Sequence, residues 1–95
     1  PYTQVVKILL TAKTKKDLST FSKTVITAIN TAYGAYMQVE GPVPCGRQAK
    51  DFYQQYLLIK SLDDNMLKSF IKTVAETKPP KQLTVKIIAN PYSFI

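Results

Sequence analysis

The first stretch of the chain alternates between two kinds of position. Over Gln4–Ala12, one set of alternate residues is apolar, whereas the other set mixes a lysine with valine and leucine. This period of two, with its valines and isoleucine, predicts a strand that has one buried face and one face partly open to solvent. The alternation returns over residues 52–61 and over Leu83–Ala89, and it predicts two further strands there.

Between these strands, the apolar spacing changes to the period of a helix. From Leu18 onward, the expected buried stripe of a first helix contains Leu18, Phe21, Val25, Ala28, Ile29 and Ala32. Ser22 falls on the polar side of this helix. Thr14 or Asp17 is expected to cap its start, and Gly34 is expected to end it with a positive φ.

A second helix is expected after Asp63 and Asp64, which are suited to cap its start. Its apolar stripe consists of Leu67, Phe70, Ile71 and Val74. The pair Pro79-Pro80 is expected to stop the helix, because proline cannot continue the hydrogen-bonded ladder.

The region between the two helices contains a further strand. Residues 35–40 are expected to be extended and to lead into the segment Gly41-Pro42-Val43-Pro44. Because proline has no N–H to donate, this segment is expected at the edge of a sheet or leaving it. Residues 45–51 are expected to form a loop.

The resulting order is strand, helix, strand, strand, helix, strand. This order consists of two strand-helix-strand units in succession. Two such units predict one α+β domain over residues 1–95, a ferredoxin-like βαββαβ plait. In this fold a four-stranded antiparallel sheet carries both helices on one face. The other face of the sheet is then available for a binding partner.

The charge of the chain favours a polyanionic partner. Lysine and arginine number 13 against 6 acidic residues, which gives a net charge of +7. All but one of these cations are lysines, which neutralise phosphates but do not read bases as a bidentate arginine does. The candidate RNA-binding residues are Lys13, Lys15 and Lys16 before the first helix, and Arg47 and Lys50 in the loop after the second strand. A merely solvated, basic surface is the alternative for each of them.

The composition excludes the commonest kinds of catalytic site. The chain has no histidine and a single cysteine, Cys45, so it has neither a Ser-His-Asp triad nor a paired-cysteine metal site. No apolar run is long enough to span a membrane. We therefore expect no enzyme activity, no cofactor, no metal and no small-molecule substrate.

Other functions of this fold remain as alternatives. The third strand has aromatic residues but lacks the Lys/Arg-Gly-Phe opening of an RNA-recognition motif. A ligand-binding or enzymatic plait would need a polar pocket, for which Glu40, Asp51 and Tyr56 are the candidates. A small adaptor that docks on partner helices is the remaining alternative.

The end of the chain is unusually apolar. Tyr92, Phe94 and Ile95 follow Asn90-Pro91, which is expected to end the last strand. We expect this tail to contact a neighbouring protein or to fold back on the open face of the sheet, with the neighbour favoured.

A specific element in the middle of the chain resembles a known family. The segment Gly41-Pro42-Val43-Pro44 leaves the second strand, precedes a basic loop, and is followed by Phe52 eleven positions after the glycine. This pattern is similar to the ribosomal protein S-ten family, also called NusE. The resemblance implies a structural ribosomal protein in the small-subunit head, bound to ribosomal RNA and neighbouring ribosomal proteins. It implies that Gly41, Pro42 and Pro44 shape the strand exit.

The chain also departs from that family. Members have a long β-hairpin between the second and third strands, whereas few residues separate Pro44 from Phe52 here. The family's usual Arg-Thr-His run is replaced by residues 56–60. The loss of the hairpin and of the Arg-Thr-His run is typical of a divergent, mitochondrial ribosomal protein. It is equally consistent with the large-subunit mitochondrial relative of this fold. Because the sequence opens at Pro1 and not at a methionine, the chain is expected to be processed or trimmed.

Overall fold

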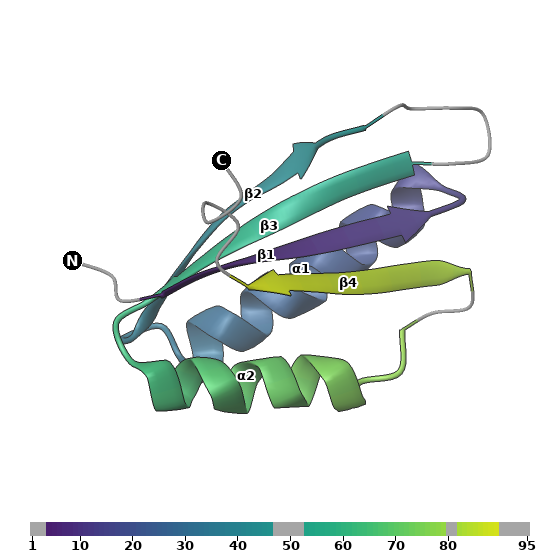
Figure 1. The fold of residues 1–95 in the computed structure, drawn as a ribbon. Helices are drawn as coiled ribbons and strands as arrows, with labels where there is room; N and C mark the ends of the chain where they lie inside the picture. The colour runs from purple at the N-terminus through teal and green to yellow at the C-terminus, as the bar shows by residue number, and fades with distance from the viewer. Residues whose placement is uncertain (1–3, 47–52, 80–81, 90–95) are drawn as a thin grey trace.

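The computed structural model describes residues 4–46, 53–79 and 82–89 of the chain. Its elements are β1 (Gln4–Ala12), α1 (Lys15–Ala32), β2 (Met37–Pro44), β3 (Tyr53–Ser61), α2 (Asp64–Glu76) and β4 (Leu83–Ala89). The strands form one sheet in the order β2-β3-β1-β4, and all neighbours are antiparallel (Figure 1). This arrangement confirms the predicted ferredoxin-like plait.

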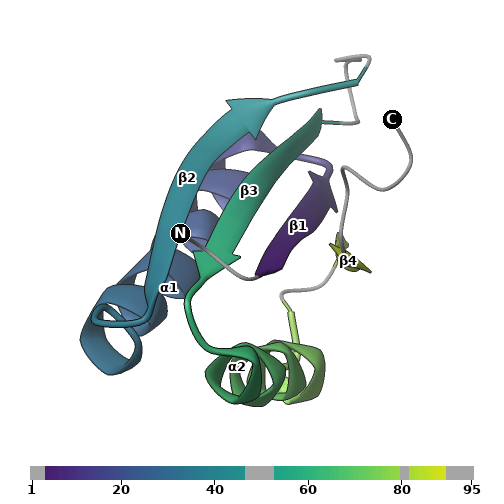
Figure 2. The ribbon, with the colours of Figure 1, turned by 60° about the vertical axis from the view of Figure 1, so that its left-hand side comes forward.

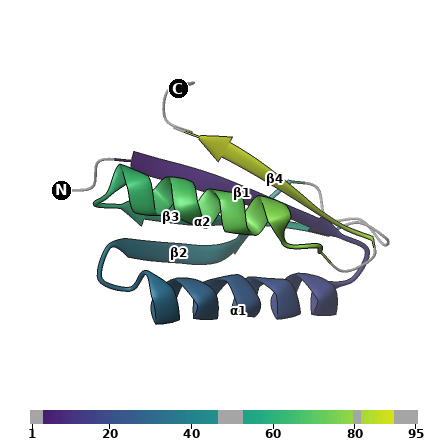
Figure 3. The ribbon, with the colours of Figure 1, turned by 90° about the horizontal axis from the view of Figure 1, so that it is seen from below.

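Both helices lie on the same face of the sheet, as Figures 2 and 3 show. The core lies between them and the sheet because alternate strand residues point toward the helices. The sheet contributes Val6, Ile8, Leu10, Ala12, Met37, Leu57, Ile59 and Leu83, and the helices contribute Leu18, Phe21, Val25, Ile29, Leu67, Phe70 and Val74. The opposite face carries no helix among the described residues.

The first helix begins earlier and ends differently from the prediction. It starts at Lys15, three residues before the first apolar residue of its stripe, because Thr14 is the N-cap. Gly34 does not cap its end with a positive φ, so that prediction was wrong. The Tyr33 N–H instead bonds to the Ile29 carbonyl at 2.7 Å, which closes the last turn without a left-handed residue.

The second strand begins two residues later and ends four residues later than predicted. Val43 and Pro44 pair with Tyr56 and Gln55 of β3, so the proline segment belongs to the strand. The prolines are tolerated because β2 is an edge strand that needs hydrogen bonds on one side only. The Cys45 N–H then bonds to the Gln54 carbonyl at 3.1 Å, which continues the pairing beyond the strand.

One polar residue is buried against expectation. Ser22 was predicted on the polar side of α1, yet only 1% of its surface is exposed. The Gln55 amide donates hydrogen bonds to Ser22 Oγ and, at 3.1 Å, to the Leu18 carbonyl. A buried hydroxyl is stable when it is paired in this way, and the pair ties α1 to β3.

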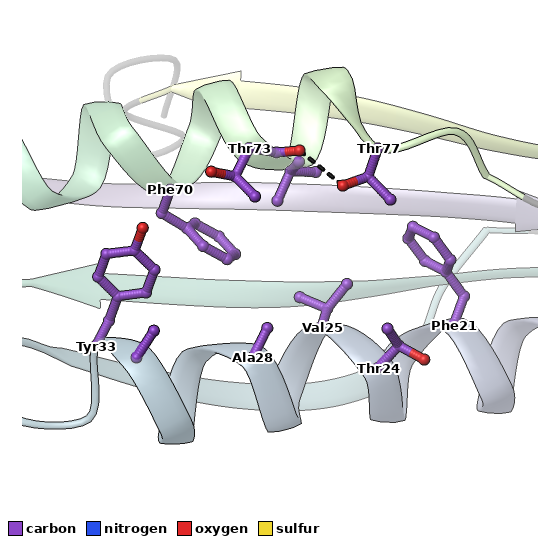
Figure 4. Close-up of a pocket in the computed structure, with 10 residues that line it drawn as sticks. Phe21, Thr24, Val25, Ala28, Tyr33, Phe70, Thr73 and Thr77 are labelled. Atoms are coloured by element: carbon purple, nitrogen blue, oxygen red, sulfur yellow. Dashed lines mark hydrogen bonds between the residues drawn. The ribbon is translucent and has the colours of Figure 1, made fainter.

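The two helices leave a shallow apolar groove between them (Figure 4). It has a volume of about 200 Å³ and is lined in part by Phe21, Val25 and Phe70. Ala28 and Ala32, which were predicted in the core, are exposed along this groove. They are exposed because an alanine side chain is too short to bridge the gap to α2.

The second helix confirms the predicted cap, because Asp63 Oδ1 accepts a hydrogen bond from the Met66 N–H at 2.9 Å. The helix ends at Glu76, before the predicted stop at Pro79, and the Thr77 N–H bonds back to the Thr73 carbonyl. No helix of the described residues is long and apolar enough to cross a membrane.

Candidate nucleic-acid interface

Three lysines gather where β1 passes into α1. Lys13, Lys15 and Lys16 are all exposed, and the latter two occupy the first turn of the helix. The backbone N–H groups at the start of a helix carry partial positive charge, which adds to that of the ammonium groups. The structure therefore brings the three predicted lysines together at a position that favours an anion.

The start of α1 is fixed by a side-chain cap. Thr14 Oγ1 accepts a hydrogen bond from the Asp17 N–H at 3.1 Å, and the Thr14 carbonyl accepts one from Leu18. The cap leaves the Lys15 and Lys16 N–H groups pointing outward from the first turn. Thr14 thus sets the direction in which this part of the helix meets a ligand.

We expect Thr14→Ala to lower the free energy of unfolding by about 1 kcal/mol, because the Asp17 N–H loses its partner. Urea unfolding followed by circular dichroism measures this change. Thr27→Ala is the matched control, since Thr27 is exposed in the middle of α1 and alanine has the higher helix propensity there. An equal loss in both variants would contradict the capping role.

A hollow of about 350 Å³ lies beside these lysines. Lys15 and Ser19 of α1, Pro44 of β2, and Tyr53 and Gln54 of β3 contribute to its lining. Lys15 Nζ lies 5.5 Å from the centre of the Tyr53 ring, within the range of a cation–π contact. An ammonium group, an aromatic ring and a helix start thus meet at one place, a combination that suits a phosphate and its neighbouring base.

The strand-exit segment shapes the opposite wall of this hollow. Gly41 has a φ of 109°, a backbone conformation that glycine adopts readily and other residues rarely. Next to it, the register of β2 against β3 shifts between Glu40 and Val43. The Gly41-Pro42 peptide bond is cis. After the shift, Pro44 reaches the hollow beside Lys15. Gly41 and Pro42 thus lie where the register shifts, and Pro44 lies at the hollow; their role in shaping the strand exit stays a prediction.

Several predicted residues lie outside the described part of the chain. They are the loop cations Arg47 and Lys50, the acidic candidate Asp51, and the tail residues Tyr92, Phe94 and Ile95. Their predicted roles stay predictions.

The open face of the sheet carries a second group of lysines that the sequence analysis did not select. Lys7, Lys60 and Lys86 come from β1, β3 and β4, and register places each of them on the row that faces away from the helices. Lys7 Nζ lies 4.6 Å from the centre of the Tyr56 ring. The period-two pattern contained this signal, because each lysine occupies the polar row of its strand.

The remaining candidates for a polar pocket have other partners. Glu40 forms an ion pair with Lys60 at 2.8 Å, and Tyr56 lies beneath the Lys7 ammonium group. Within the described ranges, no group of three or more His, Cys, Asp or Glu residues is placed to hold a metal ion.

Comparison with known proteins adds information on the fold. No family model and no curated protein sequence matches the chain. Among solved structures, the de novo designed protein Foldit4 superposes with a TM-score of 0.73 at 12% identity, covering 92% of this chain and 94% of its own. CutA1 from Oryza sativa gives a TM-score of 0.48 at 13% identity, covering 93% of this chain and 79% of its own. At such identity, the likeness to Foldit4 shows a shared fold and nothing about function.

Proposed function

We propose that this protein is a non-catalytic, structural constituent of a ribosome that binds ribosomal RNA and neighbouring ribosomal proteins. The observation that carries the proposal is the exposed group Lys13, Lys15 and Lys16 at the capped start of α1. The hollow that Tyr53 and Pro44 form beside this group supports a nucleic-acid ligand over a simple anion.

The binding mechanism is neutralisation of phosphates together with recognition of shape. Ammonium groups contact phosphate oxygens without reading sequence, and each contact releases counterions from the RNA. The Tyr53 ring supplies a surface against which a base or ribose packs. The lysines of the open face, Lys7 and Lys86, extend the positive potential over the sheet.

The Gly41-Pro42-Val43-Pro44 segment is the basis for assigning a ribosomal RNA. Its spacing to the next aromatic residue resembles that of the ribosomal protein S-ten family, and in this structure the segment is a strand edge next to the lysine group. We assign the protein to the small-subunit head of a mitochondrial ribosome, with the same-fold protein of the mitochondrial large subunit as the alternative.

Sedimentation tests this assignment. The tagged protein, expressed in its own cells, is centrifuged through a sucrose gradient with magnesium and again after magnesium is chelated. We expect it to follow one ribosomal subunit in both gradients, which also decides between the two subunits. Migration at the top of both gradients would contradict the ribosomal assignment and favour an adaptor or a ligand-binding domain.

A further inference from the structure

Among the strands that the structure describes, none pairs with the outer edge of β4. In the sheet order, β4 is terminal, and its partner within residues 4–46, 53–79 and 82–89 is β1, from Ala12 opposite Leu83 to Val6 opposite Ala89. Its seven residues contain neither proline nor glycine. Peptide groups along its other side therefore have the spacing that an incoming strand needs. The edge at β2 differs, because Pro42 and Pro44 and the register shift interrupt it.

A depression follows this open edge. Between α2 and β4 lies a hollow of about 420 Å³, lined in part by Ala75 of the helix, Thr77 just after it, and Val85 and Ile87 of the strand. Thr84 also lines it, although its side chain belongs to the row that faces away from the helices. The edge of the strand itself is thus one wall of the hollow.

A second, separate hollow lies at the other end of the strand. It has a volume of about 290 Å³, and Val6 of β1, Ile71 of α2 and Ala89 of β4 contribute to its lining. The two hollows together span β4 from Leu83 to Ala89. In Figure 3, α2 overlies β1 and β3, and β4 runs to one side of the helix.

Both hollows are lined by apolar and polar residues, and the surrounding elements carry more lysines than acids. Val85, Ile87 and Ile71 are half-buried, so their remaining surface is available to apolar side chains. Lys68 and Lys72 are exposed one turn apart on α2, and Lys86 is exposed on the opposite row of β4. Lys78 follows the helix. The acids of α2, Asp64 and Glu76, are outnumbered here.

We propose that the edge of β4 receives an extended segment of a neighbouring protein as a fifth strand of the sheet. Residues opposite Val85 and Ile87 point into the hollow and are apolar, whereas those opposite Lys86 point to the other face and are acidic. A nucleic-acid strand fits this surface less well, because it has no peptide groups to pair with β4. The inference stands on the edge and the hollow, independently of RNA binding by the protein.

A peptide of alternating valine and glutamate, about nine residues long to match a strand, is the probe for this edge. It is fluorescently labelled and titrated against the full chain. Ala75→Glu places bulk and negative charge in the hollow at an exposed helix position. We expect it to weaken peptide binding by about tenfold or more. Thr73→Glu is the matched control, because Thr73 is exposed on the same helix but lines the groove toward α1, and its effect stays within about twofold.

The backbone of the probe provides a second test that leaves the protein unchanged. In a strand, alternate N–H groups point to opposite edges, so an added strand uses only one of the two sets. N-methylation of one set is expected to abolish binding, whereas N-methylation of the other set leaves it intact. The proposal would be overturned if the peptide does not bind, or if the two methylated peptides bind equally well. It would also be overturned if Ala75→Glu and Thr73→Glu weaken binding equally. Displacement of the peptide by an oligouridylate of similar length would also overturn it.

Discussion

Replacement of Gly41 with alanine will lower the free energy of unfolding by about 2–3 kcal/mol, because two costs act together. The first is the φ of 109°, which residues with a Cβ rarely adopt. The second is space, since a Cβ at this position meets the Tyr56 carbonyl oxygen at 2.8 Å and the Val43 nitrogen at 3.2 Å. Both atoms belong to paired backbone, which cannot move without breaking the β2–β3 ladder. Urea unfolding at neutral pH measures the loss.

Gly46 provides the matched comparison for this prediction. Its φ of 64° lies in the left-handed region, and an added Cβ meets the Gln54 Oε1 atom, the end of a flexible side chain. We expect Gly46→Ala to cost only about 1 kcal/mol, since the end of the Gln54 side chain, which donates to Thr11 Oγ1, shifts more easily than backbone and the left-handed φ is the main cost. If the two alanine variants are equally destabilised, the clash with the β3 backbone does not explain the requirement for Gly41.

Reversal of charge at Lys13, Lys15 and Lys16 will weaken RNA binding and its salt dependence together. Each phosphate contact contributes about 0.7–0.9 to the slope of log K against log salt, so the triple variant is expected to lose roughly 2–3 from that slope. At low salt the affinity falls by about tenfold or more, because three attractive charges become repulsive. The measurement is a titration of labelled ribosomal RNA at several salt concentrations with the Lys13→Glu, Lys15→Glu, Lys16→Glu variant.

The control for this variant changes net charge by the same amount elsewhere. Lys23→Glu, Lys68→Glu and Lys72→Glu alter exposed positions of the two helices, away from the first turn of α1. Their effect is expected to be limited to long-range repulsion, which salt screens, with little change in slope. Equal slopes for the two triple variants would show that net charge alone attracts the RNA, and would remove the role of the lysine group at the start of α1.

The alternation of side chains made most of the fold predictable. The bounds of β1 and β4 agree with the prediction to the residue, because each strand is flanked by segments without alternation. The start of α1 was missed because Lys15 and Lys16 carry no apolar signal, although Thr14 was recognised as a possible cap. The end of β2 was missed because the proline segment was predicted either at the edge of the sheet or leaving it. The structure shows the edge, since Val43 and Pro44 pair with β3.

The site was predictable only where it is local in sequence. Lys13, Lys15 and Lys16 are neighbours along the chain, so their proximity needed no knowledge of the fold. The approach of Tyr53 to Lys15 depends on the packing of α1 against the sheet. The same holds for Ser22, whose burial is compensated by Gln55, a partner 33 positions away. A single sequence offers no signal for such pairs.

The order of the strands has a consequence for the growing chain. Of the four described strands, β1 comes first in the chain, yet it lies between β3 and β4, and its second neighbour, β4, comes last of the four. While residues 83–89 are still unsynthesised, one whole side of β1 has no partner in its own sheet, and the apolar row from Val6 to Ala12 lacks part of its cover. Such an edge promotes wrong pairing between chains. The four-stranded sheet is therefore complete only after β4 has emerged.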